Sequence, residues 1–361
     1  MLSIPGPGVP STREQRGEMI RLLRNYLSIS RQKILKYYYG FLCVRHLLHL
    51  LCLSILEEAG VLNGYLESLG LELGYNELTH AVARKVLKTV FQEKKGFGLE
   101  EVAWASSDHS SSSDDLPAET DLTLLISLLW DDRGSFLTLC ANQSLPGCST
   151  LLFTAFGSWR ARPELDARYL WLQDLYCRVY LVGSNWDRQV LQKLIQPVLS
   201  RKPLEFCAAD EQDKQAVSKA YSSLLRSSQR SPCSVPSLTP DVVVSLGDFV
   251  MTVVLIKPSM VLEEVIGVLR LTFEYYWVLL KCSGGVPVDE RESFKLFVLH
   301  ILTTTGTAYV KYVSKAGHGQ EIFVDLLVNC DIISFVGQAL ILVFQSGIVA
   351  SLPLNPSLWD G

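Results

Sequence analysis

Apolar side chains recur along most of the chain with the three- and four-residue spacing of an amphipathic helix, whereas the strict alternation of a strand is rare. The pattern predicts a first helix over 12–38 and a second over 41–58, which is apolar nearly all round and should lie centrally. Further helices are expected over 77–95, 121–130, 135–142, 149–159, 164–182, 185–199, 204–226, 241–256, 258–282, 289–315, 320–329 and 331–345. The sequence therefore predicts an all-α fold, built mostly from antiparallel helix pairs with short connections.

Residues with strong preferences for helix ends support several of these boundaries. Ser184 or Asn185 is the expected N-cap of the helix that ends at residue 199, since either side chain can accept a hydrogen bond from the first turn. Thr239 followed by Pro240 marks another start, because proline is favoured at the first helical position.

A serine- and acid-rich stretch at 106–120 and a stretch with three prolines at 227–240 interrupt the helical pattern. We interpret both as linkers. Their serines are predicted phosphorylation sites, listed as Ser111, Ser112, Ser228 and Ser231. The expected organisation is a disordered N-terminus at 1–11, an N-terminal helical region at 12–105, the first linker at 106–120, a central helical region at 121–226, the second linker at 227–240, a C-terminal helical region at 241–350 and an irregular tail at 351–361.

The helix pairs recur at roughly 40–50 residues, the period of armadillo and HEAT repeats. Leu56–Val61 and Val343–Ile348 both end a buried helix with a small residue, a glycine and a β-branched residue. In this respect the chain resembles the armadillo/HEAT-like family, which implies a solenoid of stacked helix pairs. A generic α-helical domain shows the same helix endings, so both architectures stay open.

The apolar C-terminal third contains two segments, Phe323–Cys330 and Ala339–Phe344, that look like the repeat body of the meiosis inhibitor protein 1 family. This resemblance implies a fragment or short isoform of a large helical protein without known catalytic motifs. It also implies a nuclear scaffold that supports meiotic recombination and homologue synapsis.

Composition narrows the class of protein further. Hydrophobic residues make up 48% of the 361 residues and charged residues 19%, which excludes a mostly disordered chain. Lys and Arg number 33 against 37 Asp and Glu, and the resulting formal net charge of -4 argues against a bulk nucleic-acid binder.

The most apolar stretches are 41–56, 242–256 and 332–344. Charged or histidine residues interrupt the first two, and the third is shorter than the roughly 20 residues that a spanning helix needs, so we expect buried helices and no membrane span. The first residues lack the pattern of a secretory signal, and the nine cysteines are irregularly spaced. An intracellular, reducing location is expected, in the nucleus if the meiotic resemblance holds and otherwise in the cytoplasm or nucleus.

Cys43, His46, His49 and Cys52 have the residue types of a zinc site. Their uniform spacing of three rotates them around a single helix, so Cys43 and Cys52 fall on opposite faces and cannot share one ion. We interpret them as buried cysteines beside partly satisfied histidines.

Two other polar groups fit ordinary helix ends. His318 and Glu321 flank a glycine-rich turn, and the pair Asp131 and Asp132 precedes Arg133 in a helix-ending turn. Phosphate-binding loops, the nucleophile elbow and paired CxxC motifs do not occur in the sequence. We therefore predict no catalytic residue, no metal site and no cofactor, and expect the protein not to be an enzyme.

The first functional hypothesis is a non-enzymatic helical-repeat scaffold that binds protein partners through a few aromatic or arginine anchors. The densest aromatic cluster supplies the predicted anchors, although each could equally be part of the core: Trp159, Arg160, Tyr169, Trp171 and Trp186.

The alternative is a nucleic-acid-associated helical protein that uses the basic first helix. Arg21, Arg24 and Arg31 lie in this segment, and Tyr37–Tyr39 follow it. Such residues could contact phosphates and stack on bases. We favour a different interpretation of the same segment, a solvated basic face whose tyrosines pack inward.

Overall fold

The computed structural model describes residues 33–58, 119–160, 166–199, 210–230, 238, 240–255, 262–282, 328–329 and 331–345, together with positions 15, 18–19, 21–22, 25, 62–63 and 81–82. These residues form helices and their connecting turns, and no strand occurs among them, which confirms the predicted all-α class. The chain divides into two compact units, unit 1 at Met1–Ala220 and unit 2 at Tyr221–Gly361.

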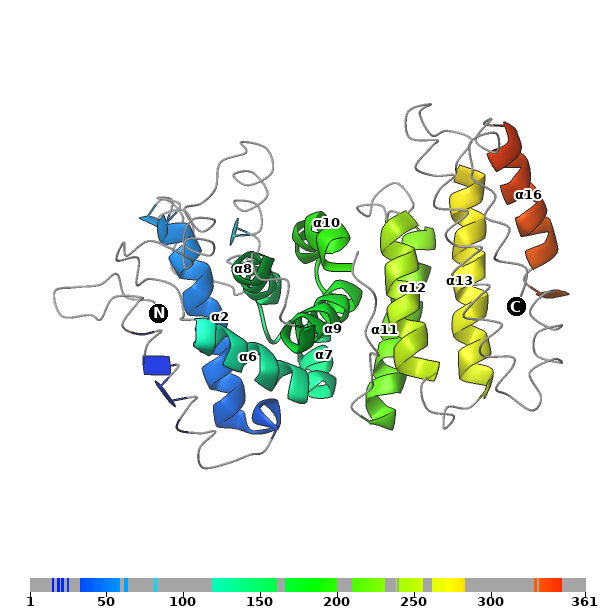
Figure 1. Cartoon of the computed structure of the whole chain (residues 1–361). Coiled ribbons are helices and arrows are strands. Elements are labelled where there is room, and N and C mark those ends of the chain that lie inside the picture. The colour runs from blue at the N-terminus through cyan, green and yellow to red at the C-terminus, as the bar shows by residue number, and fades with distance from the viewer. Residues whose placement is uncertain are drawn as a thin grey trace. The chain divides into compact units, whose positions relative to one another are not determined.

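Unit 1 is organised around one central helix, α9 (Asp166–Val182). Among the described helices, those in contact with it lie around it in Figure 1: α6 (Glu119–Asp131), α7 (Arg133–Ala141), α8 (Cys148–Arg160) and α10 (Asn185–Leu199). The long helix α2 (Tyr38–Glu58) packs against α8 and against the short 3-10 helix η1 (Ile34–Lys36). The helices predicted over 41–58 and over 121–199 are therefore confirmed, with ends that move by a few residues.

The prediction of one continuous helix over 12–38 is wrong at its C-terminal end. The chain forms η1 instead, and a new helix begins at Tyr38. Two contacts explain the break, one tertiary and one local. The carboxylate of Asp132 accepts the backbone N–H of Leu35 at 2.9 Å, and a Cβ atom at Gly40 would lie 2.2 Å from the carbonyl oxygen of Ile34, so only glycine allows this close return of the chain.

Unit 2 contains the end of α11 (Glu211–Arg230), followed by α12 (Pro240–Leu255), α13 (Leu262–Cys282) and α16 (Ile332–Gln345). Helix α13 contacts both α12 and α16 and lies between them in Figure 1. Phe335 of α16 is buried against α13, and its ring centroid lies 6.4 Å from that of Phe273 and 5.4 Å from that of Trp277. Aromatic packing therefore fixes α16 in this unit.

Two predicted helix starts are confirmed, whereas the predicted start of the second linker is wrong. Ser184 accepts the backbone N–H of Asp187 at 3.2 Å and so caps α10, and Pro240 is the first residue of α12, as expected. The linker predicted from residue 227 is wrong at its start, because α11 continues to Arg230. Ser228 is therefore a buried helical residue, and its hydroxyl donates to the carbonyl of Leu224 at 2.9 Å.

Helix α6 already begins at Glu119, inside the range predicted for the first linker. Where the chain is described, it has no helix that is both long enough and apolar enough to cross a membrane.

Candidate functional site

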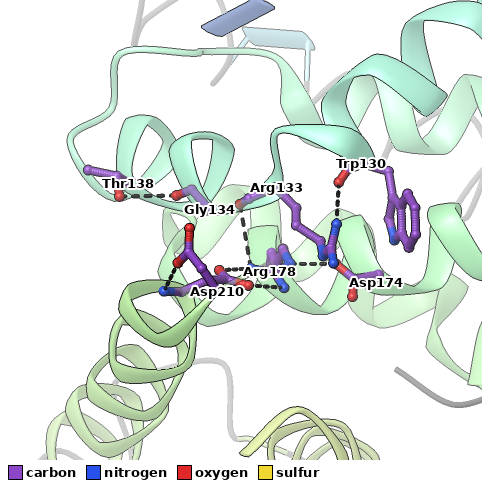
Figure 2. Close-up of polar contacts among 8 residues, drawn as sticks. Trp130, Arg133, Gly134, Thr138, Asp174, Arg178 and Asp210 are labelled. Atoms are coloured by element: carbon purple, nitrogen blue, oxygen red, sulfur yellow. Dashed lines mark hydrogen bonds and ion pairs between the residues drawn. The ribbon is translucent and has the colours of Figure 1, made fainter. Parts of the chain in front are cut away.

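A fully buried arginine is the centre of a polar cluster in the described part of unit 1. The guanidinium of Arg178 in α9 donates from its two terminal nitrogens to the two carboxylate oxygens of Asp213, at 2.5 Å and 3.0 Å. Its Nε atom forms an ion pair with Asp174, one turn earlier on the same helix (Figure 2). The planar fork of arginine matches a carboxylate in this bidentate geometry, so the three side chains form a directional cluster.

Local sequence positions each member of this cluster. Asp174 and Arg178 lie four residues apart in α9, which places them on one helix face. Asp213 lies in the first turn of α11, where its backbone N–H bonds to the carboxylate of Asp210 at 2.9 Å. Helix α7 approaches closely at Gly134, where a Cβ atom would lie 3.5 Å from the side chain of Asp213. The cluster thus joins α7, α9 and the start of α11.

A second arginine extends the polar network toward α6. Arg133 donates to the carbonyl of Trp130 at 3.0 Å, and its guanidinium lies 4.4 Å from the centre of the Trp130 ring (Figure 2). The Trp130 ring packs in turn on Trp171 of α9, with centroids 5.8 Å apart. Arg178 also approaches the carbonyl of Arg133 at 3.4 Å. Cation–π and hydrogen-bond contacts therefore join both arginines to the same helix junction.

Burial and charge set the protonation states in this cluster. Burial is the main cause that raises the pKa of Asp174, and the nearby Arg178 opposes it. For Arg178 burial would lower the pKa, but Asp174 and Asp213 outweigh it and keep the pKa above its ordinary value. Arg178 therefore stays charged and has no proton to exchange at neutral pH, and its buried position gives it a structural role.

Three buried thiols gather at the turn between α7 and α8. The sulfur atoms of Cys140 and Cys148 lie 3.6 Å apart. The sulfur of Cys52 in α2 lies 2.6 Å from the position of a Cβ at Gly147, whose φ of +86° also requires glycine. Burial raises the pKa of Cys52 to about 12, and the hydrogen bond with Cys140, followed by burial, raises that of Cys148. Cys52 and Cys148 are therefore weak nucleophiles, and all three buried thiols pack as small apolar groups.

Cys43 and Cys52 lie nine residues apart in helix α2 and so fall on opposite faces, as the helical spacing predicts, whereas His46 and His49 are neighbours. Cys52 is buried, Cys43 is half-buried, and the rings of His46 and His49 stack with centroids 6.4 Å apart. Burial, followed by the charges of His46 and Arg45, lowers the pKa of His49 to about 4, so this histidine is neutral at physiological pH. Among the residues that the structure describes, no group of three or more His, Cys, Asp or Glu could hold a metal ion.

None of the predicted partner anchors whose side chains are described is fully exposed. Tyr169 is buried in α9 and is therefore not accessible as an anchor. Trp171 is half-buried against Trp130, and Trp186 is half-buried in the first turn of α10. Trp159 and Arg160 lie in the last turn of α8, and their side chains are outside the described part.

The predicted nucleic-acid and phosphorylation residues fall mostly outside the described residues. Arg21 is exposed and forms an ion pair with Glu18 at 2.6 Å, so an acid three residues away offsets its charge. The others are not described and stay predictions: Arg24, Arg31, Ser111, Ser112 and Ser231, as well as His318 and Glu321.

Sequence reasoning missed two features of unit 1. The spacing of Asp174 and Arg178 on an apolar helix was a visible signal for a buried ion pair, but nothing in the sequence joins Asp213 to them. The tyrosines that we expected to pack inward are instead exposed: Tyr38 at 70% and Tyr39 at 77%. Their place at the first turn of α2, beside the break at η1, explains why they escape the core.

No family model, no curated protein and no solved structure matches the chain. The resemblances to armadillo/HEAT-like repeats and to the meiosis inhibitor protein 1 family therefore stay predictions.

Proposed function

We propose that the chain is a non-enzymatic helical scaffold that binds protein partners. The observation that carries this proposal is the distribution of polar and apolar groups in unit 1. In the described part of unit 1, Arg178 and its two aspartates are bonded to one another in the interior, whereas large aromatic side chains are exposed at Tyr38 and Tyr39. Exposed aromatic groups on a rigid helical support suit binding to another protein.

The exposed apolar residues of unit 2 add support for the same function. Ile333 and Ile341 of α16 are exposed, as is Val328 just before it. In a solenoid, an exposed apolar helix face of this kind would pack against another repeat or a partner. We propose a solenoid of stacked helix pairs as the finer architecture, and the consecutive short connections α6–α7 and α7–α8 are of the kind that such repeats use.

Proximity labelling with the full chain in cells, followed by binding measurements with purified candidates, tests the function. We expect at least one labelled protein to bind the purified chain directly, with a dissociation constant of about 1 μM or lower. A chain carrying Lys219→Gln, which changes an exposed residue of α11, serves as the matched control and should bind equally. The proposal is wrong if none of the labelled proteins binds the purified chain, or if the purified chain turns over a small-molecule substrate.

A further inference from the structure

We propose that Lys33, Lys36 and Tyr37–Tyr39 form a docking surface for an acidic peptide segment of a partner protein. This inference rests on the proposed scaffold function and names the chemistry of one partner. We call these five residues the tyrosine surface. They occupy η1, its two flanking residues and the first two residues of α2.

The tyrosine surface combines accessible rings with positive charge. Tyr38 and Tyr39 are 70% and 77% exposed, and their rings meet edge to face with centroids 6.2 Å apart. Lys36 is exposed and Lys33 is half-buried, and both precede the tyrosines in the chain. Tyrosine gives a large contact area with little loss of side-chain entropy, and lysine supplies a charge that an acidic residue can pair with.

The charge of the surrounding sequence favours an acidic occupant. The whole chain has more Asp and Glu than Lys and Arg, 37 against 33, yet no acidic residue occurs between positions 33 and 56. Arg45 lies one turn beyond Phe41, with its guanidinium 6.0 Å from the centre of that ring. Carboxylates of a partner would therefore meet lysine ammonium groups and tyrosine hydroxyls without an acid from this stretch to repel them.

A rigid fold holds the surface in place. Ile34 and Leu35 of η1 are buried, and the N–H of Leu35 is bonded to Asp132 in unit 1. Gly40 is packed against the carbonyl of Ile34. The exposed rings are thus held between two fixed points, so less entropy is lost when a partner binds.

The ring geometry favours a peptide over a nucleic acid. Single-stranded nucleic acids bind by stacking successive bases on aromatic faces. The rings of Tyr38 and Tyr39 are inclined by 69°, so they do not offer two parallel faces to neighbouring bases. The acidic excess of the whole chain also repels a long polyphosphate, whereas a short acidic peptide carries less charge.

Selection from a displayed library of random peptides of about a dozen residues tests the inference, with the biotinylated full chain as bait. Peptides that also bind Tyr38→Ser/Tyr39→Ser are removed. We expect the remaining peptides to be enriched in Asp and Glu, and to bind the unmodified chain about tenfold more tightly than the double variant. Since all changes are at solvent-facing side chains, the fold should be retained, which circular dichroism checks.

The lysines provide the second arm of the test. Lys33→Gln/Lys36→Gln should weaken binding of the selected peptides about tenfold at low salt and remove most of its dependence on salt. Lys219→Gln removes one exposed lysine from a different helix and should change neither quantity. A labelled oligothymidine of matched length is the competing probe.

Several results would overturn the inference. They are the selection of neutral or basic peptides, the absence of any peptide specific to the unmodified chain, and tighter binding of the oligothymidine, which would assign the surface to nucleic acid. If the peptides fail but a purified partner binds the unmodified chain and Tyr38→Ser/Tyr39→Ser equally, the scaffold function stands and only the tyrosine surface is wrong.

Discussion

The two units bury different kinds of polar group. Unit 1 holds Arg178 between Asp174 and Asp213, three charged side chains that are withdrawn from water. Unit 2 holds a neutral pair, the hydroxyls of Tyr221 and Thr272, which lie 3.2 Å apart and belong to buried residues. Charges in an apolar interior depend on their partners far more than hydroxyls do. The difference predicts that unit 1 tolerates the loss of one polar partner much less well than unit 2.

Replacing the buried arginine should have the largest effect. Arg178→Met leaves Asp174 and Asp213 buried without their cation, so we expect the free energy of unfolding of unit 1 to fall by about 3 to 5 kcal/mol. Urea-dependent hydrogen exchange, read from peptides of α9 for unit 1 and of α13 for unit 2, measures each unit by itself. Unit 2 should change little.

A triple variant shows whether the loss of stability in Arg178→Met comes from unpaired charge or from lost packing around the guanidinium. Arg178→Met with Asp174→Leu and Asp213→Leu removes all three charges together, and we expect it to recover most of the lost stability. If the triple variant is as unstable as Arg178→Met, then packing around the guanidinium, and not unpaired charge, accounts for the loss.

In unit 2 the largest loss of stability is expected when the aromatic cluster around Phe335 is disrupted. Phe335→Ala removes a buried ring that contacts Phe273, Tyr276 and Trp277, and we expect a loss of about 3 to 5 kcal/mol in unit 2. The exchange of α13 peptides should accelerate, while that of α9 peptides stays the same. Ile333→Ala on the same helix, at a side chain 74% exposed, should cost less than about 0.5 kcal/mol. Equal losses from the two substitutions would show that the ring cluster does not hold α16.

Local signals in the sequence predicted helices and caps well but not the contacts that define each unit. Ser184 and Asp187 lie three residues apart, so their capping interaction could be read directly. The break at η1 could not, because it depends on Asp132, 97 residues beyond Leu35. The partner of Arg178 was hidden for the same reason, since Asp213 is 35 residues away and comes close only in the folded chain.

Composition and periodicity gave wrong predictions for the end of α11 and for the burial of Tyr38 and Tyr39. The serines at 227 and 228 resemble a linker, but both hydroxyls donate to the carbonyl of Leu224 and so fit the last turns of α11. The exposure of Tyr38 and Tyr39, in turn, follows from where α2 begins, and helix boundaries are the least certain result of sequence patterns.

Acidification should lower the free energy of unfolding of unit 1 through His49 and raise that of unit 2 through Asp248. Burial lowers the pKa of His49 from 6.5 to about 4, so its contribution to unit 1 is present above pH 6.5 and is lost as the pH falls toward 4. Burial raises the pKa of Asp248 from 3.8 to about 6, so its contribution to unit 2 is present below pH 4 and is lost as the pH rises through 6. Each should amount to about 2 to 3 kcal/mol.

Variants isolate these two groups from the other titrating residues, including Asp174, whose raised pKa acts in unit 1 with the opposite sign to His49. The stability difference between the unmodified chain and His49→Leu should shrink in unit 1 as the pH falls from 6.5 to 4, and the difference for Asp248→Asn should grow in unit 2 as the pH rises from 4 to 6. Hydrogen exchange, corrected for its intrinsic pH dependence, measures both stability differences. A pH-independent difference in either variant would contradict the assigned pKa shift.

The smallest expected effect tests whether buried charge is the reason that unit 1 is more sensitive than unit 2 to the loss of a polar partner. Tyr176 of unit 1 and Tyr221 of unit 2 are both buried, and each places its hydroxyl against one polar group, the carbonyl of Leu191 and the hydroxyl of Thr272. Neither polar group loses its last hydrogen-bond partner in a Tyr→Phe variant. Thr272 still donates to a carbonyl of its own helix at 2.8 Å, and the carbonyl at 191 lies inside α10, where helical hydrogen bonding satisfies it.

We therefore expect Tyr176→Phe and Tyr221→Phe to lower the free energy of unfolding of their own units by the same amount, about 1 kcal/mol each, as measured by hydrogen exchange. Should Tyr176→Phe cost several times more than Tyr221→Phe, the sensitivity of unit 1 would extend to its neutral hydrogen bonds, and the arginine cluster could not by itself account for the difference between the units.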